Sequence, residues 1–268
     1  MAKSVRRGVY AIVITMGLLL TGLYFFQESL IFPAQQLPGD FQFESDIPFS
    51  EGFLEAKDGA RLNFLRLKAK EPKGIIVYYH GNGGSLERWK DIVSPFTDMG
   101  WDILVWDYRG YGKSTGKRTS EALYDDAQQI YVKALEWFEE DNILVYGRSM
   151  GTTFATYVSA RNNPSVLVLE SPFYSLQSLV KEKYSILPIY KVLKFELPTF
   201  SFAAAVSSPV YLFHGTEDDV VPYEQGAALW NEFGSLGEFI TIEGGDHNNL
   251  SETLIYQQKL TELLSQFP

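Results

Sequence analysis

Short, almost wholly apolar runs recur along the chain from residue 74 onward, and longer segments with helical spacing separate them. Runs of this length and composition are typical of buried strands. We expect strands at residues 74–79, 101–106, 143–146, 166–169, 210–213 and 238–242. Because continuous apolar strands that alternate with helices are typical of parallel sheets buried on both faces, the pattern predicts an α/β fold with a mostly parallel sheet.

Two further strands precede these six and bring the expected sheet to eight strands. Residues 52–56 and 61–69 flank the dipeptide Asp58-Gly59, which is a common β-hairpin turn. We therefore expect them to be antiparallel strands at one edge of the sheet. Residues 120–139 and 251–264 carry apolar side chains at helical spacing and are expected to be amphipathic helices that cover the sheet.

The segment 175–208 breaks this regular alternation. It contains Pro188 and Pro198 and lies between two of the expected parallel strands. Insertions at this place often cover a binding site, so we expect a small cap here, with side chains that line the substrate site. We find no linker or repeat after residue 50, and we therefore expect one folded domain over residues 51–268.

The N-terminus has a different character, because residues 9–26 contain no charged side chain. As a helix these 18 residues would span about 27 Å, close to the thickness of a bilayer's hydrocarbon core. A cleaved signal peptide is the competing interpretation. The run ends in three bulky aromatic residues without a small-x-small cleavage site, so we favour an uncleaved anchor over residues 1–26 and a tether over 27–50.

The charges around this run predict an orientation. Lys3, Arg6 and Arg7 precede it, and no Lys or Arg occurs in residues 27–50. Under the positive-inside rule the N-terminus stays in the cytoplasm. We thus expect a single-pass membrane protein whose folded domain faces away from the cytoplasm, on the periplasmic side in a Gram-negative cell.

Composition removes several classes of function. The chain has no cysteine, which excludes disulfides, thiolate metal ligands and a Cys nucleophile. Its net charge of −10 argues against a nucleic-acid partner, since phosphate binding needs clustered Lys and Arg. We expect neither a metal ion nor a cofactor.

The pentapeptide 147–151, Gly-Arg-Ser-Met-Gly, fits the pattern G-x-S-x-G. It directly follows the expected strand 143–146 and precedes a helix-like stretch. Glycines flank the serine because a sharp strand-to-helix turn leaves no room for larger side chains, and the turn projects the hydroxyl above the sheet. We therefore expect Ser149 to be a nucleophile.

A serine hydroxyl needs a base, and the chain has three histidines: His80, His214 and His247. His80 follows a buried strand and His214 ends one, so we expect both to be structural, hydrogen-bonded residues. His247 lies in the loop after the last strand, where the order Ser, acid, His of α/β-hydrolases places the base. We expect His247 to take the proton from Ser149.

The acid should lie between these two residues, at the end of a strand. Glu217, Asp218 and Asp219 are three adjacent candidates in the segment 214–222, and we favour Asp218. Its task is to accept the second N–H of the histidine and to stabilise the imidazolium. We expect the other two to belong to a solvated acidic turn.

The reaction also needs donors for an oxyanion, and backbone amides are the usual ones. The amide of Met150 follows the nucleophile at the start of a helix. The glycine-rich loop 80–84 offers a second amide, which we place at Asn82. This loop lacks the pattern of a phosphate-binding P-loop.

Several motifs in order now resemble one family over nearly the whole chain. These are His80-Gly81-Asn82, the run 107–114 (Asp-Tyr-Arg-Gly-Tyr-Gly-Lys-Ser), the pentapeptide 147–151, the segment 214–222 and Asp246-His247-Asn248. Together they are similar to the small, membrane-anchored α/β-hydrolases related to serine aminopeptidases and eukaryotic protein depalmitoylases. The resemblance implies the α/β-hydrolase fold. It also implies that Asp218 is the acid, as the fifth residue of H-G-x-x-D-x-x-V-P, and that Arg109 forms a scaffold ion pair.

The sequence thus predicts a serine hydrolase that cleaves carboxylic esters or thioesters through an acyl-enzyme, with amides or peptides as a variant of the same chemistry. A non-catalytic, membrane-anchored binding protein on a hydrolase scaffold is the alternative from another class. The retained Ser149, Asp218 and His247 argue against it, because a scaffold that only binds need not keep all three.

Overall fold

A mixed sheet forms the centre of the molecule in the computed structural model, which describes residues 2–185, 188–234 and 237–266. Within this part of the chain eight strands pair in the order β1-β2-β4-β3-β5-β6-β7-β8. The six strands from β4 to β8 run parallel, and β1 and β2 are antiparallel to their neighbours. The predicted eight-stranded, mostly parallel sheet is confirmed. The strands are β1 (Phe49–Glu55), β2 (Arg61–Leu67), β3 (Gly74–Tyr79), β4 (Trp101–Trp106), β5 (Ile143–Arg148), β6 (Val166–Glu170), β7 (Val210–Gly215) and β8 (Gly237–Ile242).

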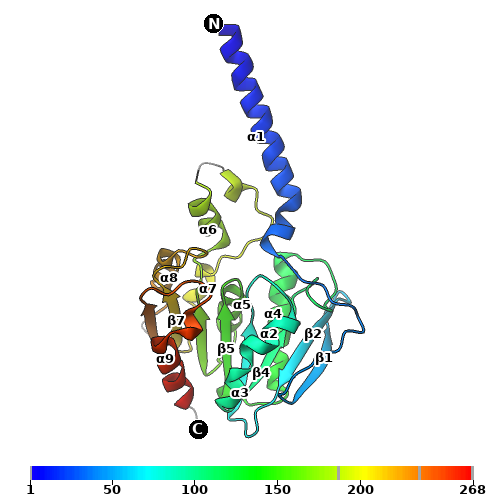
Figure 1. The fold of residues 1–268 in the computed structure, drawn as a ribbon, viewed down its shortest axis with the longest axis vertical. Coiled ribbons are helices and arrows are strands. Elements are labelled where there is room, and N and C mark those ends of the chain that lie inside the picture. Colours follow the sequence, from blue (N-terminus) through cyan, green and yellow to red (C-terminus); the bar gives the residue numbers. More distant parts are fainter. Residues whose placement is uncertain (1, 186–187, 235–236, 267–268) are drawn as a thin grey trace.

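Helices cover both faces of this sheet (Figure 1). One core joins the sheet to α4, α5 and α8, and the other joins it to α2, α3 and α9. The helices are α1 (Ala2–Ile31), α2 (Leu86–Val93), α3 (Pro95–Asp98), α4 (Ser120–Leu135), α5 (Gly151–Ser159), α6 (Leu176–Lys183), α7 (Phe200–Ala203), α8 (Tyr223–Trp230) and α9 (Leu254–Ser265), with 3-10 turns η1 (Glu140–Asn142), η2 (Pro188–Lys191) and η3 (Leu250–Glu252).

Strand β3 shows why its sequence is apolar throughout. Ile75, Val77 and Tyr79 belong to one core, and Ile76 and Tyr78 belong to the other. Side chains alternate between the faces of a strand, so a sheet covered on both sides needs apolar residues at every position. Each large side chain buried in this way contributes roughly 1.5–3 kcal/mol.

Element ends differ from the prediction by a few residues. Strands β5 and β7 continue two residues further, to Arg148 and Gly215. The helix expected over 120–139 ends at Leu135, and the chain then turns while Trp137 still packs against the core. Apolar residues at helical spacing therefore continue past Leu135, so the sequence pattern did not predict where the helix ends.

The N-terminal helix is longer than the uncharged run that predicted it. Helix α1 has 30 residues and includes the first five residues of the predicted tether. The following residues lie on the body of the protein: Phe32 and Phe43 are buried, and Ala34 pairs with Gly84 in an isolated bridge. The tether segment is thus packed against the loops that follow the strands.

The segment between β6 and β7 carries the predicted small cap. It contains α6, the turn η2 and the short helix α7. Ser175 starts α6 in a reciprocal capping box with Ser178. Figure 1 shows α6 at the end of the molecule from which α1 projects. The cap and α1 therefore share one end of the protein.

Candidate active site

Ser149 occupies a strained turn between β5 and α5. Its φ is 51°, in the left-handed region that costs residues other than glycine roughly 1–2 kcal/mol. A Cβ on Gly151 would lie 1.9 Å from the carbonyl oxygen of Tyr79, and one on Gly147 would lie 2.7 Å from the Cβ of Ala155. Both glycines are therefore required by close backbone packing, as the sequence pattern predicted.

Ser149, His247 and Asp218 meet at the carboxyl ends of the strands. His247 Nε2 lies 3.1 Å from Ser149 Oγ, and His247 Nδ1 lies 2.7 Å from Asp218 Oδ2. Each of the three residues is less than a tenth exposed. The structure thus brings the three predicted residues together in the hydrogen-bonded order that a serine nucleophile requires.

The carboxylate of Asp218 is held on both oxygens. Oδ1 accepts hydrogen bonds from the amides of Val220 and Val221 at 2.9 and 2.7 Å, and Oδ2 faces His247. Burial opposes ionisation, but the hydrogen bonds from His214, His247 and Val221 outweigh it and hold the pKa of Asp218 well below its usual range. Asp218 therefore remains a carboxylate at neutral pH.

The two other histidines have structural surroundings. His80 is fully buried, its Nδ1 lies 2.6 Å from the carbonyl oxygen of Gly81, and burial lowers its pKa to about 3. His214 is also fully buried, and its Nε2 lies 2.9 Å from the carbonyl oxygen of Val221. His80 is therefore a neutral packing residue, and His214 supports the turn that holds the carboxylate.

The two amides expected to bind an oxyanion are available for a ligand. Within the described part of the chain, neither the backbone N–H of Asn82 nor that of Met150 donates a hydrogen bond to another protein group. A Cβ on Gly81 would lie 3.7 Å from the Cβ of Ser149, so the glycine-rich loop runs beside the nucleophile. The carbonyl oxygen of Asn82 accepts from Tyr111 Oη at 2.5 Å, which fixes the loop.

The sequence analysis missed the role of Arg148 in holding the histidine loop. Its Nε lies 3.0 Å from Glu170 Oε1, and its guanidinium donates to the carbonyl oxygen of His247 at 3.2 Å. Tyr146 and Tyr256 donate in turn to Glu170. Residue 148 is a free position in G-x-S-x-G, so the motif carried no signal for this contact.

Arg109 forms the ion pair that the resemblance implied. It binds Asp126 at 2.6 Å and Asp58 at 2.5 Å. Asp58 belongs to the β1–β2 hairpin, and Asp126 belongs to α4. Arg109 therefore ties elements of the scaffold together.

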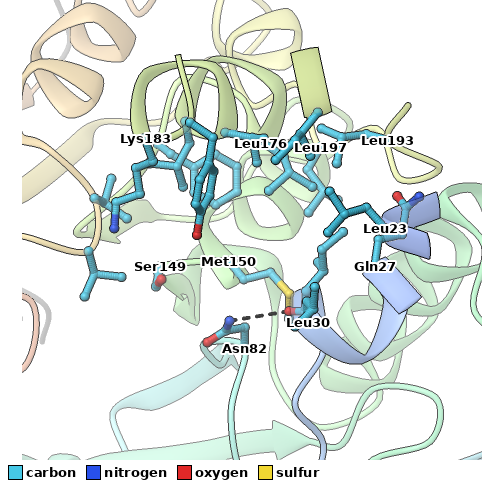
Figure 2. A pocket seen from close by; sticks show the side chains of 18 of the residues that line it. Leu23, Gln27, Leu30, Asn82, Ser149, Met150, Leu176, Lys183, Leu193 and Leu197 are labelled. Atoms are coloured by element: carbon cyan, nitrogen blue, oxygen red, sulfur yellow. Dashed lines mark hydrogen bonds between the residues drawn. The ribbon is translucent and has the colours of Figure 1, made fainter. Parts of the chain in front are cut away.

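An apolar cavity of about 430 Å³ opens beside Ser149. Its volume lies within the ~300–1,000 Å³ that is usual for small-molecule sites. Cap residues such as Leu176, Val180 and Leu193 line it, as predicted for the segment 175–208. Figure 2 shows a second wall that the sequence analysis missed, formed by the end of α1.

Titratable side chains in the described residues form no group of three that could ligate a metal ion. Among the described residues that line the cavity, Lys183 is the one charged side chain. The arrangement is therefore suited to chemistry at Ser149 on a largely apolar substrate.

The sheet order, the cap and the site geometry are those of an α/β-hydrolase. The chain has the fold of the α/β-hydrolases, and its residues 70–201, just under half of the chain, match the family model described as serine aminopeptidase, S33. This agrees with the resemblance drawn from the motifs.

Curated relatives and solved structures agree with this placement. The human alpha/beta hydrolase domain-containing protein 17B is 27% identical over 198 residues, which cover 72% of this chain and 67% of the relative. An uncharacterized protein of Mycobacterium tuberculosis is 28% identical over 201 residues, covering 73% and 71%. An esterase of Pyrococcus furiosus matches with a TM-score of 0.69 at 14% identity, covering 88% of this chain and 97% of the esterase. An acetyl xylan esterase from Paenibacillus matches with a TM-score of 0.67 at 14% identity, covering 85% and 88%.

Proposed function

We propose that this protein is a serine hydrolase that cleaves carboxylic ester or thioester bonds through an acyl-enzyme. The observation that carries the proposal is the hydrogen-bonded chain from Ser149 Oγ through His247 to Asp218, at the wall of an apolar cavity. A non-catalytic binding protein would not require this geometry.

The proposed reaction begins when Ser149 Oγ attacks the acyl carbon and His247 Nε2 takes the hydroxyl proton. Asp218 accepts the hydrogen bond from His247 Nδ1–H and stabilises the imidazolium. The oxyanion binds the amides of Met150 and Asn82. The imidazolium then protonates the leaving alcohol or thiol, and water activated by His247 releases the acid from Ser149.

A peptidase of the same fold is the second candidate, because the matching family model describes serine aminopeptidases. An aminopeptidase needs a negative group to hold the ammonium of its substrate. Among the described residues that line the cavity there is no carboxylate, and Lys183 would repel a cation. The lining therefore favours an apolar acyl group, and the Pyrococcus and Paenibacillus proteins with the same fold are esterases.

We further propose that residues 1–26 anchor the protein in a membrane and that residues 51–268 form the catalytic domain outside the cytoplasm. In the described residues one helix, α1, is long and apolar enough to cross a bilayer, with a mean hydropathy of 2.1 over its most apolar window. The positive charges in its first turns, before the uncharged run 9–26, support the proposed orientation.

A screen of p-nitrophenyl esters of graded chain length, run on the full-length protein in mild detergent, tests the proposed activity. We expect turnover that disappears in a folded Ser149→Ala variant. Turnover that survives this substitution would remove Ser149 from the mechanism. Cleavage of peptide substrates with a free amino terminus, without cleavage of esters, would favour the peptidase.

A further inference from the structure

The end of α1 is fixed to the cap by the side chain of Gln27. Its Nε2 donates to the carbonyl oxygen of Val192 at 3.0 Å, and its Oε1 accepts from the amide of Lys194 at 2.7 Å. Gln27 is 5% exposed. The side-chain amide of Gln27 thus donates one hydrogen bond to the main chain that follows η2 and accepts one from it. Neighbouring strands pair in the same way.

Three further contacts hold the same end of the helix. Glu28 forms an ion pair with Arg118 at 3.4 Å. The rings of Phe32 and Phe195 pack edge to face with centroids 4.7 Å apart. Lys194 lies 4.3 Å above the ring of Tyr24. The C-terminal end of α1 is therefore packed against the folded body.

The same turns of α1 line the cavity beside the nucleophile. Leu23, Leu30 and Ile31 belong to its wall, together with Ser149. Figure 2 shows Leu23, Gln27 and Leu30 along one side of the cavity, with the cap leucines Leu176, Leu197 and Leu193 above it and Ser149 on the opposite side. The anchor helix thus forms one side of the substrate site.

The position of these residues along α1 sets the depth of the cavity in a bilayer. Leu23 lies inside the uncharged run 9–26, and Ile31 lies five residues beyond its end, about 7.5 Å at ~1.5 Å per residue. The headgroup layer on each side of a bilayer is roughly 6 Å thick. The cavity therefore extends from the proposed edge of the hydrocarbon to the headgroup level. Phe25 and Phe26, which are 68% and 69% exposed, lie where an aromatic belt is expected.

The charge of the cap suits the same placement. The cap segment 175–208 carries four lysines (Lys181, Lys183, Lys191 and Lys194) against two glutamates, so it is net positive in a chain whose net charge is −10. Lysines close to a membrane surface are attracted by anionic lipid headgroups. The end of the protein that carries α1 is thus the end that a membrane surface would attract.

We infer that α1 and the cap together form a membrane-facing site for a long acyl chain, and that α1 determines chain-length specificity as well as anchoring the protein. The hydrocarbon enters from the bilayer, lies against Leu23 and Leu30, and presents its carbonyl carbon to Ser149. This inference rests on the proposed hydrolase function.

Leu23→Ala and Leu30→Ala in the full-length protein test the inference, with Leu18→Ala as the matched control. Leu18 lies on the same helix, is 69% exposed and does not line the cavity. Each buried methylene contact is worth about fourfold in affinity. We expect the ratio of kcat/KM for C16 esters to that for C4 esters to fall about tenfold in both lining variants and to stay unchanged in Leu18→Ala. An unchanged ratio in the lining variants would overturn the inference while leaving the hydrolase function intact.

Leu30→Trp provides the opposite perturbation, because it fills the cavity and should shorten the preferred chain. Vesicles that carry either a lysophospholipid or a palmitoyl-thioester peptide distinguish the two sources of such a chain. Turnover of either one with the same dependence on Leu30 supports the inference.

A binding readout separates this inference from the proposed chemistry. Palmitic acid with a terminal diazirine is photolysed with the Ser149→Ala protein in vesicles, and the labelled peptides are mapped. We expect labels in residues 23–31 and in the cap. Labels confined to other parts of the chain would overturn the inference even if the protein hydrolyses no ester.

Discussion

At the scale of the residue, the site depends on how firmly a few side chains are held. One carboxylate oxygen of Asp218 accepts hydrogen bonds from two backbone amides, and the other oxygen faces His247. Its neighbour Asp219 is exposed, in line with the solvated acidic turn that the sequence suggested for it. The two aspartates therefore offer a direct comparison between a held carboxylate and a free one.

We predict that Asp218→Asn lowers kcat for ester hydrolysis by up to ~10⁴-fold, because the amide no longer fixes the histidine tautomer or stabilises the imidazolium. Asp219→Asn should change kcat less than about threefold, since surface substitutions disturb little. Steady-state kinetics on both variants measures the difference. If Asp219→Asn is the more damaging, the acid has been assigned to the wrong residue.

Arg148 gives a prediction about positioning. Its guanidinium joins Glu170 to the main chain of the His247 loop. The double variant Arg148→Met with Glu170→Gln removes this link without leaving an unpaired buried charge. We expect kcat to fall by roughly 10- to 100-fold with little change in KM, because a small displacement of the base is costly. A KM effect alone would mean that Arg148 acts on substrate binding instead.

At the scale of the element, the strands brought the predicted residues together because their carboxyl ends meet at one edge of a parallel sheet. Ser149 follows β5, Asp218 follows β7 and His247 follows β8, so three residues far apart in sequence become neighbours. Apolar runs predicted these strands well, because a strand that is buried on both faces needs apolar side chains along its whole length. The order of the strands in the sheet does not follow from the runs, and it is known from the structure.

The contacts of α1 could not be predicted in the same way. A run of apolar residues indicates that a helix is buried or lies in a membrane, but it does not predict which residues contact the end of that helix. Gln27 looked like the first residue of a tether, whereas its side chain binds Val192 and Lys194, more than 160 residues away. A hydrogen bond between one polar side chain and a distant stretch of backbone produces no periodic pattern in the sequence, so it could not be predicted from one.

Gln27→Leu should therefore loosen the junction between α1 and the cap. It leaves the Val192 carbonyl and the Lys194 amide without their partner, at a cost of about 1–3 kcal/mol. We expect trypsin to cleave after Lys191 and Lys194 several times faster than in the parent protein. Gln42→Ala is the control, because Gln42 is exposed and bonds only to nearby Asp40. Equal cleavage rates in all three proteins would show that Gln27 does not hold the cap.

At the scale of the whole molecule, α1 gives the protein a strong asymmetry. The helix projects from the body at the end that carries the cap (Figure 1), and many of its apolar side chains are exposed. A bilayer would cover these side chains and would leave the acidic body in water. The proposed site for the acyl chain lies at the junction between the two.

This asymmetry predicts how the protein distributes in cells. Fractionation should recover it with membranes, and protease added to spheroplasts should degrade the domain over residues 51–268. The reason is the positive charge of Lys3, Arg6 and Arg7, before the uncharged run 9–26, together with the absence of Lys and Arg in residues 27–50. Recovery in the soluble fraction would contradict the anchor. A membrane-bound domain that external protease does not reach would contradict the orientation.

Labelling with a fluorophosphonate probe tests the central claim most directly, because the probe reacts only with a serine that a neighbouring base activates. We predict that the full-length protein is labelled, that mass spectrometry places the adduct on Ser149, and that folded Ser149→Ala and His247→Ala variants remain unlabelled. A folded parent protein that takes up no label, or an adduct on a serine other than Ser149, would contradict the account.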